Sequence, residues 1–146
     1  MKENIYKGLN QYLADVGVLY IKLHNLHWNV IGSNFKSTHE YLETLYDEMT
    51  IVLDETAEVL KMNNQTPLAS MKSFLEVTSI KELDSKDYSV KEAIEITLKD
   101  MEYLHKSVSD LRALAIESDC FDVISLLEDN LKNYNKTIWF LNSMSK

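Results

Sequence analysis

Residues 4–62, NIYKGLNQYLADVGVLYIKLHNLHWNVIGSNFKSTHEYLETLYDEMTIVLDETAEVLKM, contain two long runs of helical spacing on either side of a short break. The first run repeats apolar residues every three or four positions, as one face of an α-helix does; they are Ile5, Leu9, Leu13, Val16, Leu19, Leu23, Leu26 and Val30. In the break, Gly32-Ser33-Asn34, glycine suits the end of a helix and serine or asparagine suits the start of the next. The stretch predicts a helical hairpin over about Asn4–Ile31 and about Phe35–Met62.

The rest of the chain repeats this arrangement after a longer connection. Asn63-Asn64-Gln65-Thr66-Pro67 ends the second helix, and the residues from Leu68 to Ser89 indicate a connection with a short helix near Met71–Leu75. Helical spacing resumes over about Val90–Glu117 and, after a break at Ser118-Asp119-Cys120, continues to about Ser143. Two tightly joined helix pairs separated by one long connection indicate an all-α fold: a ferritin-like four-helix bundle with a long crossover that contains a short helix.

Composition limits the fold and the functions to be considered. The length of 146 residues favours a single domain over residues 1–146. Only three glycines and one proline are present, which argues against many short strands and favours a few long helices. No apolar run reaches the roughly 20 residues that a membrane span requires, and the N-terminus lacks the order of a secretion signal. The single Cys120 allows no intrachain disulfide and fits a reducing compartment, so we expect a cytoplasmic protein.

The net charge of −8 argues against nucleic acid as a partner. An acidic surface repels phosphate backbones and anionic membranes, and it attracts cations. A basic tail would override this repulsion, but the N-terminal arm has only Lys2 and Lys7 around Glu3, and the chain ends Ser143-Met144-Ser145-Lys146. Because DNA affinity depends on the number of phosphates neutralised, we expect no DNA binding through an exposed arm.

Five side chains along the predicted hairpin suit a metal site with nitrogen and oxygen donors: His27, His39, Glu43, Asp54 and Glu58. Four of them lie on the second predicted helix. With His39 at zero on a helical wheel, the three carboxylates lie in chain order at about 40°, about 60° and about 100°. The apolar residues of this helix centre at about 275°, so the four donors form a stripe turned about 135° away from the core of the bundle.

One chain cannot bring this whole stripe to one metal ion. Glu43 and Asp54 are eleven residues apart, which is about 16 Å along a helix, whereas metal–ligand bonds are about 2 Å long. A second copy solves this if a twofold axis passes the helix between residues 48 and 49 and the two copies run antiparallel. Glu43 is then level with the partner's Asp54, and His39 with the partner's Glu58, as an isologous interface requires.

His27 precedes the break and His39 follows it, so an antiparallel hairpin brings the two close together. The pattern predicts two equivalent sites per dimer. Each takes His27, His39 and Glu43 from one chain together with the partner's Asp54 and the partner's Glu58. The alternative is an ordinary charged face on a bundle without metal chemistry, because single histidines and carboxylates on helices are usually solvated or satisfied within the fold.

The motif His27-Trp28-Asn29-Val30-Ile31-Gly32, followed by Phe35, His39-Glu40, Glu43, Asp54-Glu55 and Ala57-Glu58, resembles the signature of the Dps family, the miniferritins named as DNA-binding proteins from starved cells. The likeness extends over the whole chain, including Ile138-Trp139 in the last helix. The resemblance implies a hollow shell of twelve subunits with ferroxidase sites at its twofold interfaces, and it assigns the same five residues to those sites. It also implies oxidation of Fe(II), typically by hydrogen peroxide, and storage of the ferric product, which protects against oxidative damage.

The resemblance makes a pair of iron ions the expected occupant of each site, with zinc as a substitute in vitro. The chain departs from the family pattern in three places. Glu43 stands where the family often has Asp, Asn63-Asn64 where it often has Gly-Gly, and the basic tail of DNA-binding members is missing. Acidic pore residues in the family come from the start of the last helix, where the candidates are Asp119, Asp122 and Glu128.

Other functions remain open at this level. One is a DNA-compacting or structural shell with a vestigial metal site, and another is a zinc-loaded or purely structural bundle. A third is an intrachain di-iron oxidase. Such an oxidase needs two Glu-x-x-His motifs. Glu102 and His105 form one, but the second is absent because the residue three positions before His39 is Lys36 and not glutamate. We expect His105 to be structural and His24 to be a surface or interface residue, while Trp28 is either an electron donor or a packed interface aromatic.

Overall fold

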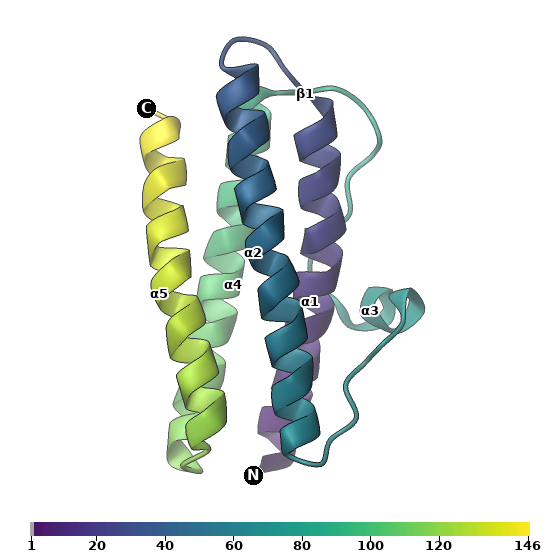
Figure 1. Ribbon diagram of the computed structural model, residues 1–146, viewed down its shortest axis with the longest axis vertical. Coiled ribbons are helices and arrows are strands. Elements are labelled where there is room, and N and C mark those ends of the chain that lie inside the picture. The colour runs from purple at the N-terminus through teal and green to yellow at the C-terminus, as the bar shows by residue number, and fades with distance from the viewer. Residues whose placement is uncertain (1) are drawn as a thin grey trace.

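The computed structural model describes residues 2–146 and forms a bundle of four long helices (Figure 1). These are α1 (Lys2–Asn29), α2 (Phe35–Met62), α4 (Val90–Glu117) and α5 (Phe121–Met144). The short helix α3 (Met71–Val77) lies in the crossover, which runs the length of the bundle, so that α2 and α4 point the same way. The bundle with one crossover that the sequence predicts is confirmed.

The first helix ends two residues earlier than the sequence predicts. Val30–Ile31 forms the strand β1, which pairs in parallel with β2, Tyr88–Ser89. This short pairing ties the end of the α1–α2 hairpin to the residues just before α4. Apolar spacing does not reveal it, because Val30 is buried in the strand as it would be in a helix.

The turn between α1 and α2 depends on residues that accept positive φ. Gly32 has φ +111° and Asn34, the residue before α2, has φ 66°. Glycine and asparagine reach this region at the least steric cost. The predicted break therefore forms a sharp reversal, which sets the last turn of α1 beside the first turn of α2.

One apolar cluster, to which all four long helices contribute, fills the bundle. Its centre also holds a small hydrogen-bonded group, in which the hydroxyls of Tyr12 and Tyr134 bond to each other and Asn130 Nδ2 donates to the Tyr12 hydroxyl (2.8 Å). Asp15 is the only buried carboxylate among residues 2–146. An intrachain di-iron site needs several inward-facing carboxylates, so this bundle does not support that alternative.

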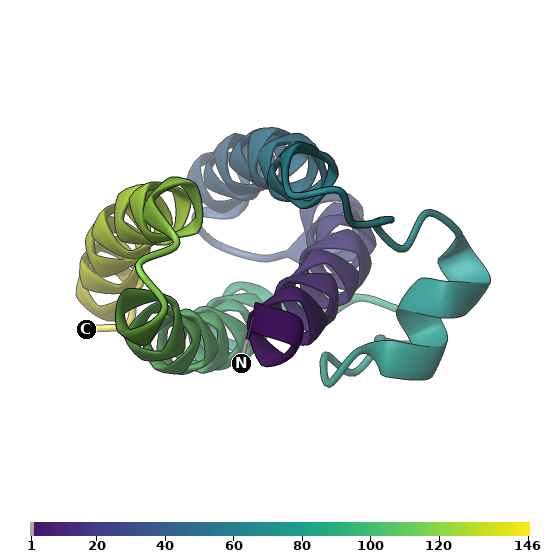
Figure 2. The same cartoon turned by 90° about the horizontal axis from the view of Figure 1, so that it is seen from below.

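The crossover packs against α1, outside the ring of four helices (Figure 2). The Asp15 carboxylate accepts hydrogen bonds from Thr78 Oγ1 and Ser79 N, both at 2.8 Å, and from Tyr103 Oη at 2.7 Å. Two residues farther along α1, Gly17 meets the Phe74 ring so closely that a Cβ would lie 2.5 Å from it. Both sets of contacts fix the position of α3 on the outside of the bundle.

Within residues 2–146, no helix is both long enough and apolar enough to cross a membrane.

Candidate metal centre

His27 and His39 lie against each other across the α1–α2 turn. Their rings stack with centroids 3.7 Å apart and planes inclined by 12°. His27 Nδ1 is 2.7 Å from the main-chain oxygen of His39, and His39 Nδ1 is 2.6 Å from the main-chain oxygen of His27. The predicted proximity of the two histidines is thus confirmed, and each one orients the other.

These reciprocal bonds determine which ring nitrogen carries the proton. A carbonyl oxygen accepts hydrogen bonds and cannot donate them, so both Nδ1 atoms must donate. In the neutral imidazole, Nε2 then keeps its lone pair. A second hydrogen bond of this kind is the usual device that orients a metal-binding histidine. Both rings therefore present an Nε2 lone pair, the donor through which a neutral imidazole can bind a metal ion.

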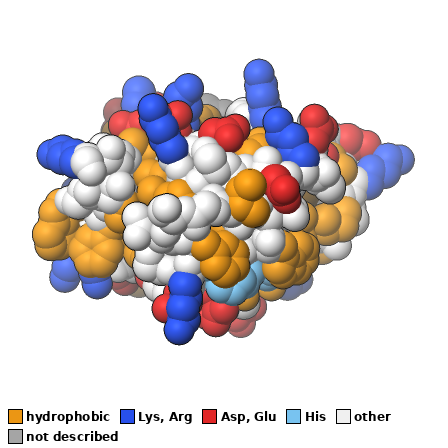
Figure 3. All heavy atoms as spheres, turned by 90° about the horizontal axis from the view of Figure 1, so that it is seen from above, with side chains coloured by type: hydrophobic (Ala, Val, Ile, Leu, Met, Phe, Trp, Pro, Cys, Tyr) orange, Lys and Arg blue, Asp and Glu red, His pale blue; other side chains and the backbone are white. Residues whose placement is uncertain are grey.

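A carboxylate stands next to this histidine pair. Glu43 Oε1 lies 3.9 Å from His27 Nε2. The His27 side chain is almost entirely buried, whereas the Glu43 side chain is 53% exposed. These three side chains form a cluster that is open toward solvent at Glu43. We call it the half-site, because the sequence predicts that a second copy completes it. Figure 3 shows histidine reaching the surface among hydrophobic side chains at this end of the bundle.

The other two predicted residues lie farther along α2. Asp54 and Glu58 are exposed, which agrees with the helical wheel that turned the stripe away from the core. No group of three or more His, Cys, Asp or Glu side chains within residues 2–146 is placed to hold a metal ion. In a single chain, the structure brings His27, His39 and Glu43 together and leaves Asp54 and Glu58 apart from them.

Aromatic side chains surround the half-site, and Tyr46 is the one among them that sequence reasoning did not assign. Tyr46 meets His27 edge-on at 5.1 Å and stacks on His24 at 3.7 Å, while the His24 ring lies 5.3 Å from that of Trp28. Burial and the nearby Glu43 carboxylate raise the pKa of Tyr46, so its phenol stays protonated at neutral pH. The sequence could have indicated that Tyr46 lies near the half-site, because on a helical wheel it falls one turn after Glu43 and on the side that faces α1.

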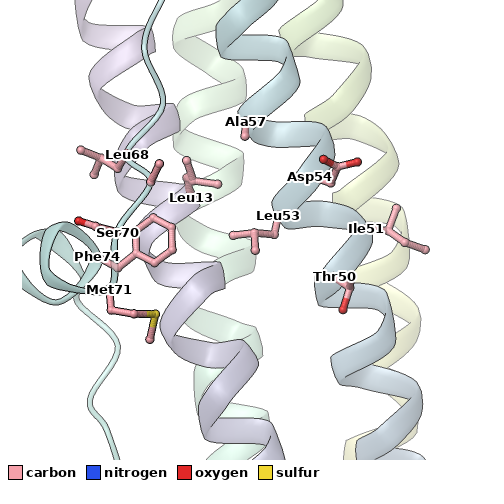
Figure 4. A pocket seen from close by; sticks show the side chains of 11 residues that line it. Leu13, Thr50, Ile51, Leu53, Asp54, Ala57, Leu68, Ser70, Met71 and Phe74 are labelled. Atoms are coloured by element: carbon pink, nitrogen blue, oxygen red, sulfur yellow. The ribbon is translucent and has the colours of Figure 1, made fainter.

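A groove lies beside Asp54, between α2 and the crossover (Figure 4). It has a volume of about 700 Å³ and a mostly apolar lining. Leu53 and Ala57 line it from α2, Leu68 from the crossover and Phe74 from α3. Asp54 stands at its rim, on the exposed side of α2. Sequence patterns do not reveal this groove, because the position of α3, which forms one of its walls, depends on tertiary contacts.

Three of the remaining residues of interest, His105, Glu128 and Asp122, have side-chain partners within the chain. His105 Nε2 bonds to Asn135 Oδ1 at 2.8 Å, as its structural role predicts. Glu128 pairs with Arg112 at 2.6 Å, and Asp122 Oδ2 accepts a bond from an asparagine at the end of α2. Asp119 has φ 50° in the turn before α5. These contacts do not test whether the three acidic residues line a pore, which stays a prediction.

The chain matches the Ferritin-like domain family over residues 6–146. Antigen TpF1 of Treponema pallidum (strain Nichols) is 38% identical over 143 residues, which cover 97% of this chain and 80% of the relative. The DNA protection during starvation protein 2 of Bacillus anthracis is 33% identical over 141 residues, covering 97% and 96%. The solved DPS protein from Vibrio cholerae O1, described as a member of a broad superfamily of ferritin-like diiron-carboxylate proteins, has a TM-score of 0.92 and 27% identity, covering 99% of this chain and 90% of that one.

Proposed function

Because this chain belongs to the Dps family of ferritin-like proteins, we propose that it oxidises Fe(II) at di-iron sites shared between two subunits and stores the ferric product in a hollow shell. The observation that carries the proposal is the pair of Nδ1–H to carbonyl bonds between His27 and His39. They leave an Nε2 lone pair on each ring, and that of His27 lies beside the exposed Glu43 carboxylate.

A twofold axis near Glu48 and Met49 completes each half-site. Asp54 and Glu58 are exposed on the same stripe of α2, at the distances from the axis that mirror those of Glu43 and His39. An antiparallel partner helix brings its two carboxylates level with Glu43 and His39. The partner's two carboxylates and Glu43 together gather negative charge, which Fe(II) ions bound between the two chains would offset.

The donor set suits the oxidation of iron. Imidazole nitrogens and carboxylate oxygens bind first-row metals, and hard oxygen donors favour Fe(III) over Fe(II). Two Fe(II) ions each release one electron, and one molecule of hydrogen peroxide takes up these two electrons and two protons to give two molecules of water. Iron enters as the substrate and leaves as the ferric product. The five side chains hold the two ions and supply negative charge that offsets their increased charge.

A shell of many subunits, twelve in the form that the family resemblance implies, buries further surface. Large apolar side chains also lie exposed outside the half-site, among them Met62, Phe121 and Trp139. Exposed apolar side chains that gather in patches often mark contacts between proteins. Storage inside the shell fits the chemistry, because Fe(III) released outside it would form an insoluble precipitate.

Mixed subunits test the shared site. Asp54→Ala and His27→Ala each damage one half of every site, so we expect neither protein alone to oxidise Fe(II) with peroxide. Coexpressed subunits that assort at random place one intact site at each mixed interface, and about one quarter of all sites are then complete. The measurement is the initial rate of ferric absorbance growth after peroxide is added to anaerobic Fe(II).

The pair Asp54→Ala with Glu58→Ala is the matched control. Both changes affect the same half of the site, so no mixed interface contains an intact site and no activity returns. Rescue in both mixtures, or activity in a monomer, would contradict the shared site. Zinc occupancy without oxidation would favour a structural role for the metal.

DNA compaction is the second candidate, because relatives carry the name DNA protection during starvation protein. The net charge of −8 argues against it. We expect no shift of duplex DNA in a gel at low salt, and a shift that disappears as salt rises would establish this alternative.

A further inference from the structure

Two tyrosine hydroxyls meet in the centre of the bundle, away from the proposed metal site. Tyr12 of α1 and Tyr134 of α5 are 0% and 2% exposed, and their hydroxyls share one hydrogen bond. Asn130, which is also buried, donates through Nδ2 to the Tyr12 oxygen at 2.8 Å. Such a polar group adds only modest net stability to an apolar core, and none of its three members takes part in the iron chemistry proposed above. We refer to Tyr12 and Tyr134 as the tyrosine pair.

The hydrogen bonds set the direction in which the tyrosine pair can pass a proton. Each phenol has one hydrogen to donate. If Tyr134 donated to Tyr12, the Tyr12 hydrogen would be left without an acceptor in the apolar core, at a cost in free energy. Tyr12 therefore accepts from Asn130 and donates to Tyr134. The hydrogen of Tyr134 is then left to bond outside the pair.

A polar cleft between α2 and α5 adjoins this end of the pair. Tyr134 and Asn130 line it from α5, and Glu48 lines it from α2. Its volume of about 390 Å³ gives room for several water molecules, each of which occupies roughly 30 Å³ in the liquid. Burial raises the pKa of Tyr134, and the negative charge of Glu48 raises it further. Burial also raises the pKa of Glu48, so its carboxylate takes up a proton more readily than an exposed one.

A shared site that holds a single Fe(II) needs a second source of electrons. Hydrogen peroxide takes up two electrons and two protons to give two molecules of water, whereas one Fe(II) releases only one electron. Without another donor, cleavage of the O–O bond yields Fe(III), a hydroxide ion and a hydroxyl radical. A phenol can supply the missing electron, and it becomes a neutral tyrosyl radical when it also loses its proton.

We propose that the tyrosine pair supplies this electron, so that peroxide is fully reduced at a half-filled site. The inference rests on the proposed oxidation of Fe(II). Fe(II), one peroxide, one phenol and one proton give Fe(III), two molecules of water and one tyrosyl radical. The electron crosses α2, which is about 10 Å wide with its side chains. The phenolic proton passes through Tyr134 to the cleft, while the site takes two protons from solution. The negative charge of Glu48 favours loss of the electron, and burial keeps the radical away from solution.

Two other tyrosines donate to neighbours that suit this chemistry less well. Tyr103 Oη donates to Asp15 at 2.7 Å, but a proton moved onto Asp15 would remove the charge that anchors the crossover. Tyr88 Oη donates to the main-chain oxygen of Asp84 at 2.7 Å, and an amide oxygen is too weak a base to take the proton. Tyr88 is therefore a buried, hydrogen-bonded phenol that lacks a proton acceptor, which makes it a matched control.

Freeze-quench electron paramagnetic resonance detects the radical directly. The assembled protein is loaded without oxygen with less than one Fe(II) per shared site and is then mixed with hydrogen peroxide. We expect a tyrosyl signal that is several-fold weaker when two Fe(II) ions fill each site, because iron then supplies both electrons. The double variant Tyr12→Phe with Tyr134→Phe should lose the signal and release several-fold more hydroxyl radical to a spin trap. Tyr88→Phe should behave as the original protein does.

The rate of iron oxidation separates failure of this proposal from failure of the proposed function. With two Fe(II) ions per site, this rate should be unchanged in the double variant. Normal oxidation with an undiminished tyrosyl signal, or with a signal lost in Tyr46→Phe instead, would overturn the role of the pair and retain the shared site. No oxidation of iron in the original protein would overturn both. Glu48→Gln leaves the core intact and removes the proton acceptor, so the signal should form several-fold more slowly, and an unchanged rate would contradict the proton route.

Discussion

His27 and His39 hold each other through their main chains: each Nδ1 donates to the backbone carbonyl of the other residue, at 2.7 and 2.6 Å, and the rings stack 3.7 Å apart. Because backbone carbonyls remain whatever side chain is present, each ring keeps its orientation when the other is removed. The contribution of each histidine can therefore be measured with a single substitution.

Removal of either ring should remove a metal donor without unfolding the hairpin. For His39→Ala we expect the rate of Fe(II) oxidation to fall at least about tenfold. Loss of a residue that only orients a metal ligand already lowers activity by about tenfold or more, and His39 is proposed to bind the metal itself. Circular dichroism should show unchanged helix content. His105→Ala is the control, since that ring bonds to Asn135 on another surface. Equal loss in both variants would argue against a specific site.

Gly17 and Gly8 allow a matched test of how the crossover is held. An added Cβ would lie 2.5 Å from the Phe74 ring at Gly17 and 2.5 Å from the end of the Leu111 side chain at Gly8. A ring packed against a helix moves less readily than a terminal methyl group. Gly17→Ala should cost about 1–3 kcal/mol from overpacking, whereas Gly8→Ala regains up to about 1 kcal/mol from helix propensity.

Urea unfolding measures the stability of the two glycine variants, and limited proteolysis shows which segment of each is cleaved first. The crossover should become the first cleavage site in Gly17→Ala, because displacement of Phe74 releases α3. Equal stability and equal cleavage in the two variants would show that the Phe74 contact does not hold the crossover.

Asp15 should be the most sensitive polar residue of the fold. Its carboxylate accepts from Thr78, Ser79 and Tyr103, and Asn in its place turns one acceptor oxygen into a donor. We expect Asp15→Asn to lower the free energy of unfolding by about 1–3 kcal/mol. Asp110→Asn, which removes an exposed ion pair with Lys106, should cost about 1 kcal/mol or less. Chemical denaturation compares the two.

Deprotonation of Glu48 should lower the free energy of unfolding as the pH rises. Burial raises the pKa of Glu48 above its ordinary value despite the nearby Lys136. The folded state then holds this proton more tightly than the unfolded state, so the stabilisation is present at low pH and is lost as pH rises through the raised pKa. Glu48→Gln removes the titration. The free energy of unfolding of Glu48→Gln, relative to that of the original protein, should therefore increase as the pH rises above about 4, which is near the pKa of glutamate in an unfolded chain. A constant difference in unfolding free energy would contradict this.

Much of the fold follows from local patterns. The bounds predicted for Phe35–Met62 and Val90–Glu117 agree with α2 and α4, because helices depend on hydrogen bonds between residues four apart and on an apolar stripe of matching period. The outward position of the three carboxylates on α2 also follows, since the angle between two residues of one helix depends only on their separation. The end of α1 does not follow, because β1 pairs with residues that lie beyond two further helices.

By itself, the sequence determined the four long helices, the hairpin that brings His27 near His39, and the stripe of donors spaced evenly about one point of α2. Each is a matter of spacing along a regular helix or of a turn at glycine and asparagine. Only the tertiary structure decided the protonated nitrogen of both histidines, the anchoring of the crossover at Asp15, and the groove beside Asp54. These depend on backbone carbonyls, which leave no mark in a sequence, and on contacts between segments that meet only when the chain has folded.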